Sequence, residues 1–274
     1  MSEPQPISES PLVTVSGLRK QYGDFTAVDG IDLDVPPGQV FGVLGPNGAG
    51  KTTTMRMITG LIEPTSGTIT IDGFDLEDDT VDAKKITGFI PDRPYVYEKL
   101  TAFEYLRFIG GLYHMRRAET ADRIDELLTL FELREFSSSL IESFSHGMKQ
   151  RLVFAGAMLP EPRLLVIDEP MVGLDPKGHH LVKRLFRQLV EQQEMSILLS
   201  THTLEVAEEV CDQIVIINHG RIVARGTLGQ LQLESGETDG NLEKVFLRLT
   251  KQSEEERHRD VARRFGDEPG EQAS

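Results

Sequence analysis

A glycine-rich loop between a predicted strand and a predicted helix constrains the fold of this 274-residue chain more than any other feature. The loop spans residues 45–52 and fits the pattern G-x-x-x-x-G-K-[ST]. Residues 39–44 are largely apolar and predict a buried strand, and residues 51–59 predict a helix. A strand, such a loop and a helix in this order begin an α/β unit, so we expect an α/β fold with parallel strands.

The same loop has the residues that bound phosphate groups require. Its glycines let backbone N–H groups converge on phosphate oxygens, and the following helix adds the positive end of its dipole. Lys51 lies in the first helical turn, where a cation is unfavourable unless an anion is present. Thr52 offers a hydroxyl suited to Mg²⁺. The loop therefore predicts a nucleotide site.

Three more residues are expected to complete the chemistry of this site. Asp168 and Glu169 follow the apolar residues 164–167, which predict a buried strand. Asp168 would bind the metal ion, and Glu169 would orient the attacking water for in-line phosphoryl transfer. His202 follows the last predicted parallel strand, whose carboxyl end lines the ligand crevice, so it could bond the γ-phosphate and Glu169. Tyr22 precedes the loop. It is either an ordinary surface aromatic or a ring on which adenine could stack.

A helical region interrupts the strand-rich pattern of the chain. Residues 95–160 are mostly helical in pattern, so the chain reads as one α/β unit with a helical insertion between two halves of its core. Within the insertion, Ser145 and Gly147 offer a hydroxyl and backbone amides at the start of a predicted helix. Such a helix start is a second candidate anion site.

Composition limits the classes of function. The net charge of −15 opposes nonspecific binding to nucleic acid or anionic lipid, since both need a positive surface. The single cysteine, Cys211, fits a reducing compartment and is expected to be buried. We expect neither a signal peptide nor a bilayer span, because no apolar stretch approaches about 20 residues. A role at a membrane would then require other chains to hold this one there.

The order of these motifs resembles the ATP-binding subunit of an ABC transporter, over roughly residues 12–230. The resemblance implies a P-loop NTPase (RecA-like) core, an N-terminal antiparallel β subdomain and a helical subdomain inserted at about 93–160. Residues 1–11 would be disordered. Residues 231–274 would form a short, partly disordered C-terminal extension, with fraying from Lys251 onward.

The resemblance also implies how the site works. Two subunits would sandwich two ATP molecules, each γ-phosphate lying between Lys51 of one chain and Ser145 of the other. ATP would hold the dimer together, and hydrolysis would release it. Glu169 and His202 would be the catalytic residues. The expected cofactor-binding residues are Tyr22, Gly45, Pro46, Asn47, Gly48, Ala49, Gly50, Lys51, Thr52, Thr53, Ser145, Gly147, Met148 and Asp175.

The sequence departs from the family pattern at three positions. The family has a signature turn, which here is Ser145 to Met148. The family usually has Gly where His146 stands and Gln where Met148 stands, but Ser145 and Gly147 are retained. Asp92 stands where the family usually has Gln; it can bind Mg²⁺, but it is shorter and adds a negative charge beside the two acids. The expected metal ligands are Thr52, Asp168 and Asp92.

The leading hypothesis is an ATPase subunit that drives a membrane permease encoded on another chain. Its expected partners are ATP, Mg²⁺, that permease and a second ATPase subunit in a homodimer or heterodimer, at the cytoplasmic side of the membrane. The form of the signature and the absence of an expected regulatory domain after residue 230 favour export. The alternatives are an ABC-type ATPase acting on nucleic acid or ribosomes, and a catalytically silent module. No nucleic acid is expected, given the acidic balance, and Glu169 and His202 oppose the silent reading.

One further segment bears on the permease. Residues 92–105 include aromatic and aliphatic side chains that could line a groove for a short helix of a membrane subunit, or could simply pack in the core. These side chains are Tyr95, Tyr97, Leu100 and Phe103.

Overall fold

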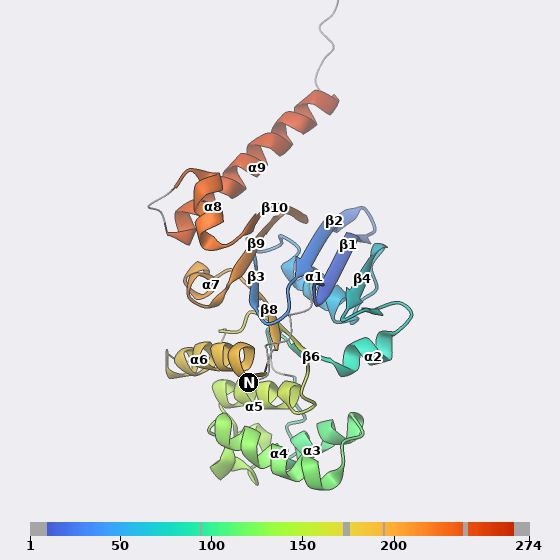
Figure 1. The fold of residues 1–274 in the computed structure, drawn as a ribbon, viewed down its shortest axis with the longest axis vertical. Helices are drawn as coiled ribbons and strands as arrows, with labels where there is room; N and C mark the ends of the chain where they lie inside the picture. Colours follow the sequence, from blue (N-terminus) through green and yellow to red (C-terminus); the bar gives the residue numbers. More distant parts are fainter. Residues whose placement is uncertain (1–9, 94, 172–175, 194, 238–240, 266–274) are drawn as a thin grey trace, which may run out of the picture.

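The computed structural model describes residues 10–93, 95–171, 176–193, 195–237 and 241–265, and this part of the chain contains two sheets (Figure 1). The larger sheet has six strands in the order β10-β9-β3-β8-β7-β6. In chain order they are β3 (Val40–Leu44), β6 (Thr87–Ile90), β7 (Leu164–Asp168), β8 (Ser196–Thr201), β9 (Gln213–Asn218) and β10 (Arg221–Gly226).

Parallel pairing dominates this sheet. Every neighbouring pair from β9 to β6 is parallel, whereas β10 returns antiparallel to β9 as a hairpin. All residues of β3, β7 and β8 are buried. Strands covered on both faces are typically continuous apolar runs, which is why these three were readable in the sequence. The short strand β6 was not predicted.

The smaller sheet is antiparallel and lies near the N-terminus, in the order β2-β1-β4-β5. Its strands are β1 (Val13–Tyr22), β2 (Phe25–Val35), β4 (Ser66–Ile71) and β5 (Phe74–Asp75). Helix α1 (Lys51–Ile58) contributes Met55, Met57 and Ile58 to an apolar cluster shared with strands of both sheets. The phosphate loop therefore leads into a helix anchored on both sides.

The helices between the two halves of the larger sheet lie together at one end of the molecule (Figure 1). They are α3 (Ala102–Leu112), α4 (Arg117–Leu130) and α5 (His146–Met158), with two short 3₁₀ turns at Arg134–Phe136 and Ile141–Ser143. A capping box starts α3: the Thr101 hydroxyl accepts from the Glu104 N–H, and the Glu104 carboxylate accepts from the Thr101 N–H. Helix α2 (Thr80–Lys85) precedes β6.

Aromatic rings connect these helices to the core. Phe131 after α4, Phe154 on α5 and Phe186 on α6 (Pro176–Gln193) are each at most 1% exposed. The ring centroids are 6.0 Å apart from Phe131 to Phe154 and 6.4 Å from Phe154 to Phe186. Phe154 is thus the middle ring of a row that joins the helical insertion to the central layer.

The C-terminal region differs from the expected fraying. After α7 (Leu204–Val210) and β10, the chain forms α8 (Leu228–Ser235) and then α9 (Leu242–Phe265), which continues well past Lys251. Leu242, Val245 and Leu249 are buried against α7, α8 and the β9–β10 hairpin, so the start of α9 is fixed by packing. An (i, i+4) ion pair between Lys251 and Glu255 supports the next turn.

No helix in the described ranges is long and apolar enough to cross a bilayer.

Removing the middle aromatic ring should destabilise the fold. We expect Phe154→Ala to lower the free energy of unfolding by about 3–5 kcal/mol, because it leaves a cavity between two buried rings. Urea denaturation measures this, with Phe25→Ala as the control. Phe25 is 62% exposed, so its loss should change stability by no more than about 0.5 kcal/mol. Equal losses in both variants would contradict the role of the row.

Candidate nucleotide site

The phosphate loop is held in a shape that requires glycine. Gly50 precedes α1 with φ of +108°, in the left-handed region, and a Cβ there would lie 2.5 Å from the Ala27 carbonyl oxygen. A Cβ on Gly45 would lie 2.3 Å from the Ile217 carbonyl oxygen. The loop therefore runs tightly between β2 and the β9–β10 hairpin, and its backbone shape is set before any ligand binds.

Lys51 occupies the centre of this loop. It is 6% exposed, and its Nζ donates to the Gly45 carbonyl at 2.8 Å and to the Pro46 carbonyl at 3.2 Å. Burial lowers the pKa of Lys51, while the charges of Glu169 and Asp168 act in the opposite direction. The two acids therefore lie close enough to influence the loop cation, as the nucleotide hypothesis requires. The first turn of α1 has no acidic residue to compete for it.

The acidic pair ends β7 and meets the end of β8. Asp168 is 1% exposed, pairs with Ser200 in the parallel register, and accepts a hydrogen bond at Oδ1 from the Ser200 hydroxyl. Glu169 follows with φ of +54°, a left-handed conformation that is uncommon for a residue with a Cβ. Its N–H donates to the Ser200 carbonyl at 3.0 Å.

The structure brings His202 to Glu169, as the sequence analysis anticipated. The His202 Nδ1 lies 2.7 Å from Glu169 Oε1. The other carboxylate oxygen, Oε2, accepts from the Thr201 hydroxyl at 3.3 Å. Sequence reasoning missed Ser200 and Thr201. The available signal was their position immediately before His202, at the end of an apolar strand that leads to the same edge as the acids.

The residues present fit Mg²⁺ held together with a phosphate. Within the described ranges no group of three or more His, Cys, Asp or Glu could hold a metal alone. Mg²⁺ in phosphate sites usually takes one or two protein ligands and completes its shell with waters and phosphate oxygens. Thr52 in the first turn of α1 and Asp168 beside the loop match that demand.

Asp92 lies two residues after β6, whose Ile90 pairs with Ile167 of β7. This register directs the chain at Asp92 toward the edge where the acidic pair emerges. Among the described residues, no hydrogen bond or ion pair joins the Asp92 carboxylate to another side chain.

The signature turn opens α5. Ser145 precedes the helix, and its Oγ accepts from the Met148 N–H at 3.3 Å, while His146 is exposed and Gly147 half-buried. Figure 1 shows α5 beside α3 and α4, apart from α1. The candidate anion site at Ser145 is thus open to solvent, on a helix that lies apart from α1. Asp175, also expected to contact nucleotide, lies outside the described residues.

Tyr22 ends β1 and is 50% exposed. The Lys20 Nζ lies 5.2 Å from the centroid of its ring, and Phe25, across the turn, is 62% exposed. An accessible ring beside a cation is a suitable surface for a stacked base.

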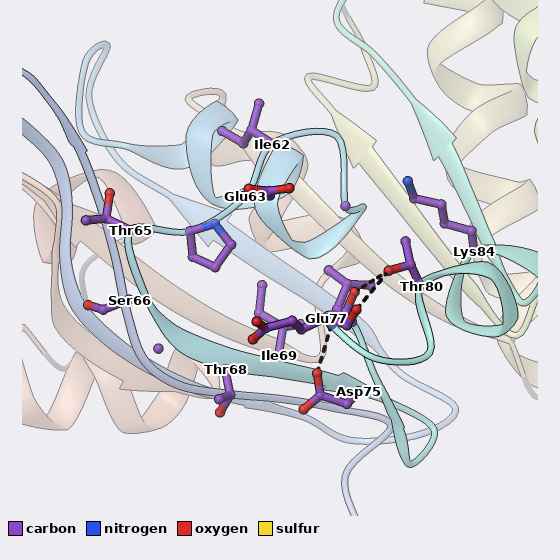
Figure 2. Close-up of a pocket in the computed structure, with 14 residues that line it drawn as sticks. Ile62, Glu63, Thr65, Ser66, Thr68, Ile69, Asp75, Glu77, Thr80 and Lys84 are labelled. Carbon is purple, nitrogen blue, oxygen red and sulfur yellow. Dashed lines mark hydrogen bonds between the residues drawn. The ribbon is translucent and has the colours of Figure 1, made fainter.

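A hollow of about 500 Å³ lies elsewhere, beyond the C-terminal end of α1 (Figure 2). Its walls come from the segment after α1, from β4 and β5, and from α2, and include Glu63, Glu77 and Lys84. None of the residues expected to bind nucleotide lines it. The candidate nucleotide site is therefore formed by the loop and the acidic pair, and not by this hollow.

Comparison with known proteins identifies the family. The model of the ABC transporter family matches residues 28–172, which contain the phosphate loop, the signature turn and the acidic pair. The chain belongs to the ABC transporter family. ATP-binding proteins of this family are ATPases, so this ABC protein is an ATPase with a P-loop NTPase core, as the resemblance implied.

Individual relatives agree with this assignment. The chain is 38% identical over 215 residues to a Nod factor export ATP-binding protein I of Cupriavidus metallidurans, covering 78% of this chain and 71% of the relative. It is 39% identical over 216 residues to a linearmycin resistance ATP-binding protein of Bacillus subtilis, covering 79% and 69%. A solved ATP-binding subunit of an ABC transporter superposes with a TM-score of 0.82 at 37% identity, covering 87% of this chain and 99% of that one.

Glu169→Gln should separate binding from hydrolysis. Gln keeps the shape but cannot accept the proton of the attacking water, so we expect turnover to fall at least about 100-fold while ATP still binds. Steady-state ATPase assays measure turnover, and light scattering in the presence of ATP measures the fraction of dimer. Glu208→Gln, on the exposed side of α7, is the matched control and should leave both unchanged. Wild-type turnover in Glu169→Gln would contradict the assignment.

Asp92→Gln should change the metal requirement and leave the fold intact. The change removes one carboxylate, so we expect the Mg²⁺ concentration that half-saturates ATP hydrolysis to rise about two- to fivefold. Stability should change by less than about 0.5 kcal/mol, since no described side chain bonds to Asp92. Asp92→Asn, which keeps the length, separates charge from reach. An unchanged Mg²⁺ dependence in both variants would argue that Asp92 has no part in the metal site.

Proposed function

We propose that this ABC protein is the subunit that hydrolyses ATP to drive a permease on a separate chain, in the export direction. The observation that carries the proposal is the convergence of Lys51, Asp168 and Glu169 at one edge of the sheet, with His202 bonded to Glu169. Relatives named for export or drug resistance support the direction.

Each residue at this edge has a task. Lys51 would exchange its bonds to the Gly45 and Pro46 carbonyls for phosphate oxygens. Mg²⁺ bound by Thr52 and Asp168, with Asp92 nearby, would neutralise phosphate charge. Glu169 would orient water for attack.

His202 would link the base to the transferred phosphate. Its Nδ1 lies on Glu169, which leaves Nε2 for a γ-phosphate oxygen. Both partners accept hydrogen bonds, so the bridge requires a proton on each ring nitrogen.

Two copies would complete the site. Ser145 and His146 at the start of α5 are exposed, and α5 lies apart from α1, the helix that follows the chain's own phosphate loop. A second copy, or a similar subunit, would bring its nucleotide to that helix start, where N–H groups and the helix dipole favour an anion. A solved dimeric ATP-binding cassette bound to ADP and Pi, 26% identical with a TM-score of 0.72, supports this arrangement.

An aromatic surface on the helical insertion is the proposed contact with the permease. Tyr95 and Tyr97 are 77% and 60% exposed, and Tyr97 makes an edge-to-face contact with Phe108 at 5.4 Å. Leu100 and Phe103 instead pack against the core. We therefore propose only Tyr95 and Tyr97 of this segment as contacts for the permease. Such a patch on a protein with no membrane-crossing helix in its described part suits a peripheral subunit on the cytoplasmic side.

Tyr95→Ser combined with Tyr97→Ser tests that contact. We expect loss of co-purification with the permease subunit, because two exposed rings leave the interface. ATP hydrolysis by the isolated subunit should remain within about twofold, since neither ring contacts the nucleotide edge. Leu233→Ser, 72% exposed on α8, is the control. Intact co-purification of the double variant would refute the proposed surface, and failure of the wild type to co-purify would refute the transport role.

A further inference from the structure

Two buried hydroxyl side chains end β8 directly beside the acidic pair. Ser200 is fully buried and Thr201 is 1% exposed, and they are the last two residues of the strand. Buried hydroxyls are costly unless they form hydrogen bonds, so their partners indicate what holds them there. In both cases the partner is a carboxylate of the acidic pair.

Ser200 fixes the orientation of Asp168. An ionised carboxylate only accepts, so the Ser200 hydroxyl donates to Asp168 Oδ1. No other described side chain bonds to Asp168. With Oδ1 engaged, Oδ2 is the oxygen left for a metal ligand. The Ser200 carbonyl also accepts from the Glu169 N–H, so one residue holds the backbone after the strand as well.

Thr201 fixes the orientation of Glu169. Its Oγ1 accepts from the Thr203 N–H at 3.0 Å, which orients the single hydroxyl proton away from that amide. The proton is then directed to Glu169 Oε2 at 3.3 Å. Since His202 engages Oε1, the carboxylate is held at both oxygens. A base held in this way has one orientation available for the attacking water.

We propose that Ser200 and Thr201 are positioning residues with separate tasks: Ser200 orients Asp168 for the metal ion, and Thr201 orients Glu169 for hydrolysis. The inference deepens the proposed function and rests on it for the identity of the metal and the reaction. Residues that orient metal ligands typically affect metal affinity or activity about 10- to 100-fold when removed, which sets the expected scale.

The first test uses Mn²⁺ as a spectroscopic probe for the metal. The test uses the Glu169→Gln variant, so that bound ATP is not turned over. This variant is saturated with ATP, and Mn²⁺ binding is followed by electron paramagnetic resonance. We expect Ser200→Ala to weaken Mn²⁺ binding at least about tenfold and Thr201→Val to change it less than about twofold. Ser196→Ala is the matched control, because Ser196 is an equally buried serine at the opposite end of β8, bonded to the Gly38 N–H.

The second test uses turnover at saturating ATP and Mg²⁺. We expect Thr201→Val to lower kcat at least about tenfold with KM unchanged, and Thr201→Ser to restore it, because only the hydroxyl is required. In the Glu169→Gln background Thr201→Val should have no further effect on kcat, as expected for a residue that acts through Glu169. Ser200→Ala should recover most of its kcat when Mg²⁺ is raised.

Each failure has a distinct meaning. Equal loss of Mn²⁺ binding in Ser200→Ala and Ser196→Ala would overturn the task of Ser200. Undiminished kcat in Thr201→Val, or an equal further loss in the Glu169→Gln background, would overturn that of Thr201. If Ser200→Ala does not fold, Ser200→Cys keeps the volume with a weaker donor and should still weaken Mn²⁺ binding. Failure of the wild type to hydrolyse ATP would overturn the proposed function and Thr201's task with it, whereas the Mn²⁺ test would still decide for Ser200.

Discussion

The parallel pairing of β8 with both β3 and β7 is the constraint on which the rest of the site depends. It brings the carboxyl ends of three strands to one edge, so that the phosphate loop, the acidic pair and His202 meet although they are far apart in the chain. The strands tolerate this central position because most of their residues are apolar and all are buried, with the polar residues of β7 and β8 confined to the strand ends. The arrangement of the site residues at this edge therefore depends on the packing of the strands in the interior.

Packing also makes the helical insertion part of the core. One apolar cluster includes residues of α3, α4 and α5 together with residues of β7, β8 and α6. The row of Phe131, Phe154 and Phe186 crosses this cluster. A displacement of the signature turn on α5 would thus be resisted by the packed central layer. This is the physical basis on which a contact at Tyr97 could be linked to nucleotide.

Local features were predictable from the sequence, and long-range contacts were not. The strand before the phosphate loop, the helix after it and the apolar strand before the acidic pair each depend on neighbouring residues, and each was predicted. The bonds from Ser200 and Thr201 depend on the register between strands 32 residues apart, which no local pattern shows. The continuation of α9 beyond Lys251 was missed, because that segment mixes charges of both signs.

The backbone at Glu169 limits how this position can vary. A left-handed conformation costs a residue with a Cβ roughly 1–2 kcal/mol, more for β-branched side chains and less for Asn, Asp or Gly. The fold already bears that cost for Glu, so exchange for Gln adds none, whereas Val, Ile or Thr would strain the turn. If Glu169 has the proposed catalytic role, one conservative exchange is enough to remove hydrolysis and keep the structure. After gene duplication, this single exchange would turn one copy into a subunit that binds nucleotide without hydrolysing it. Such a copy could pair with the unchanged subunit in an asymmetric dimer.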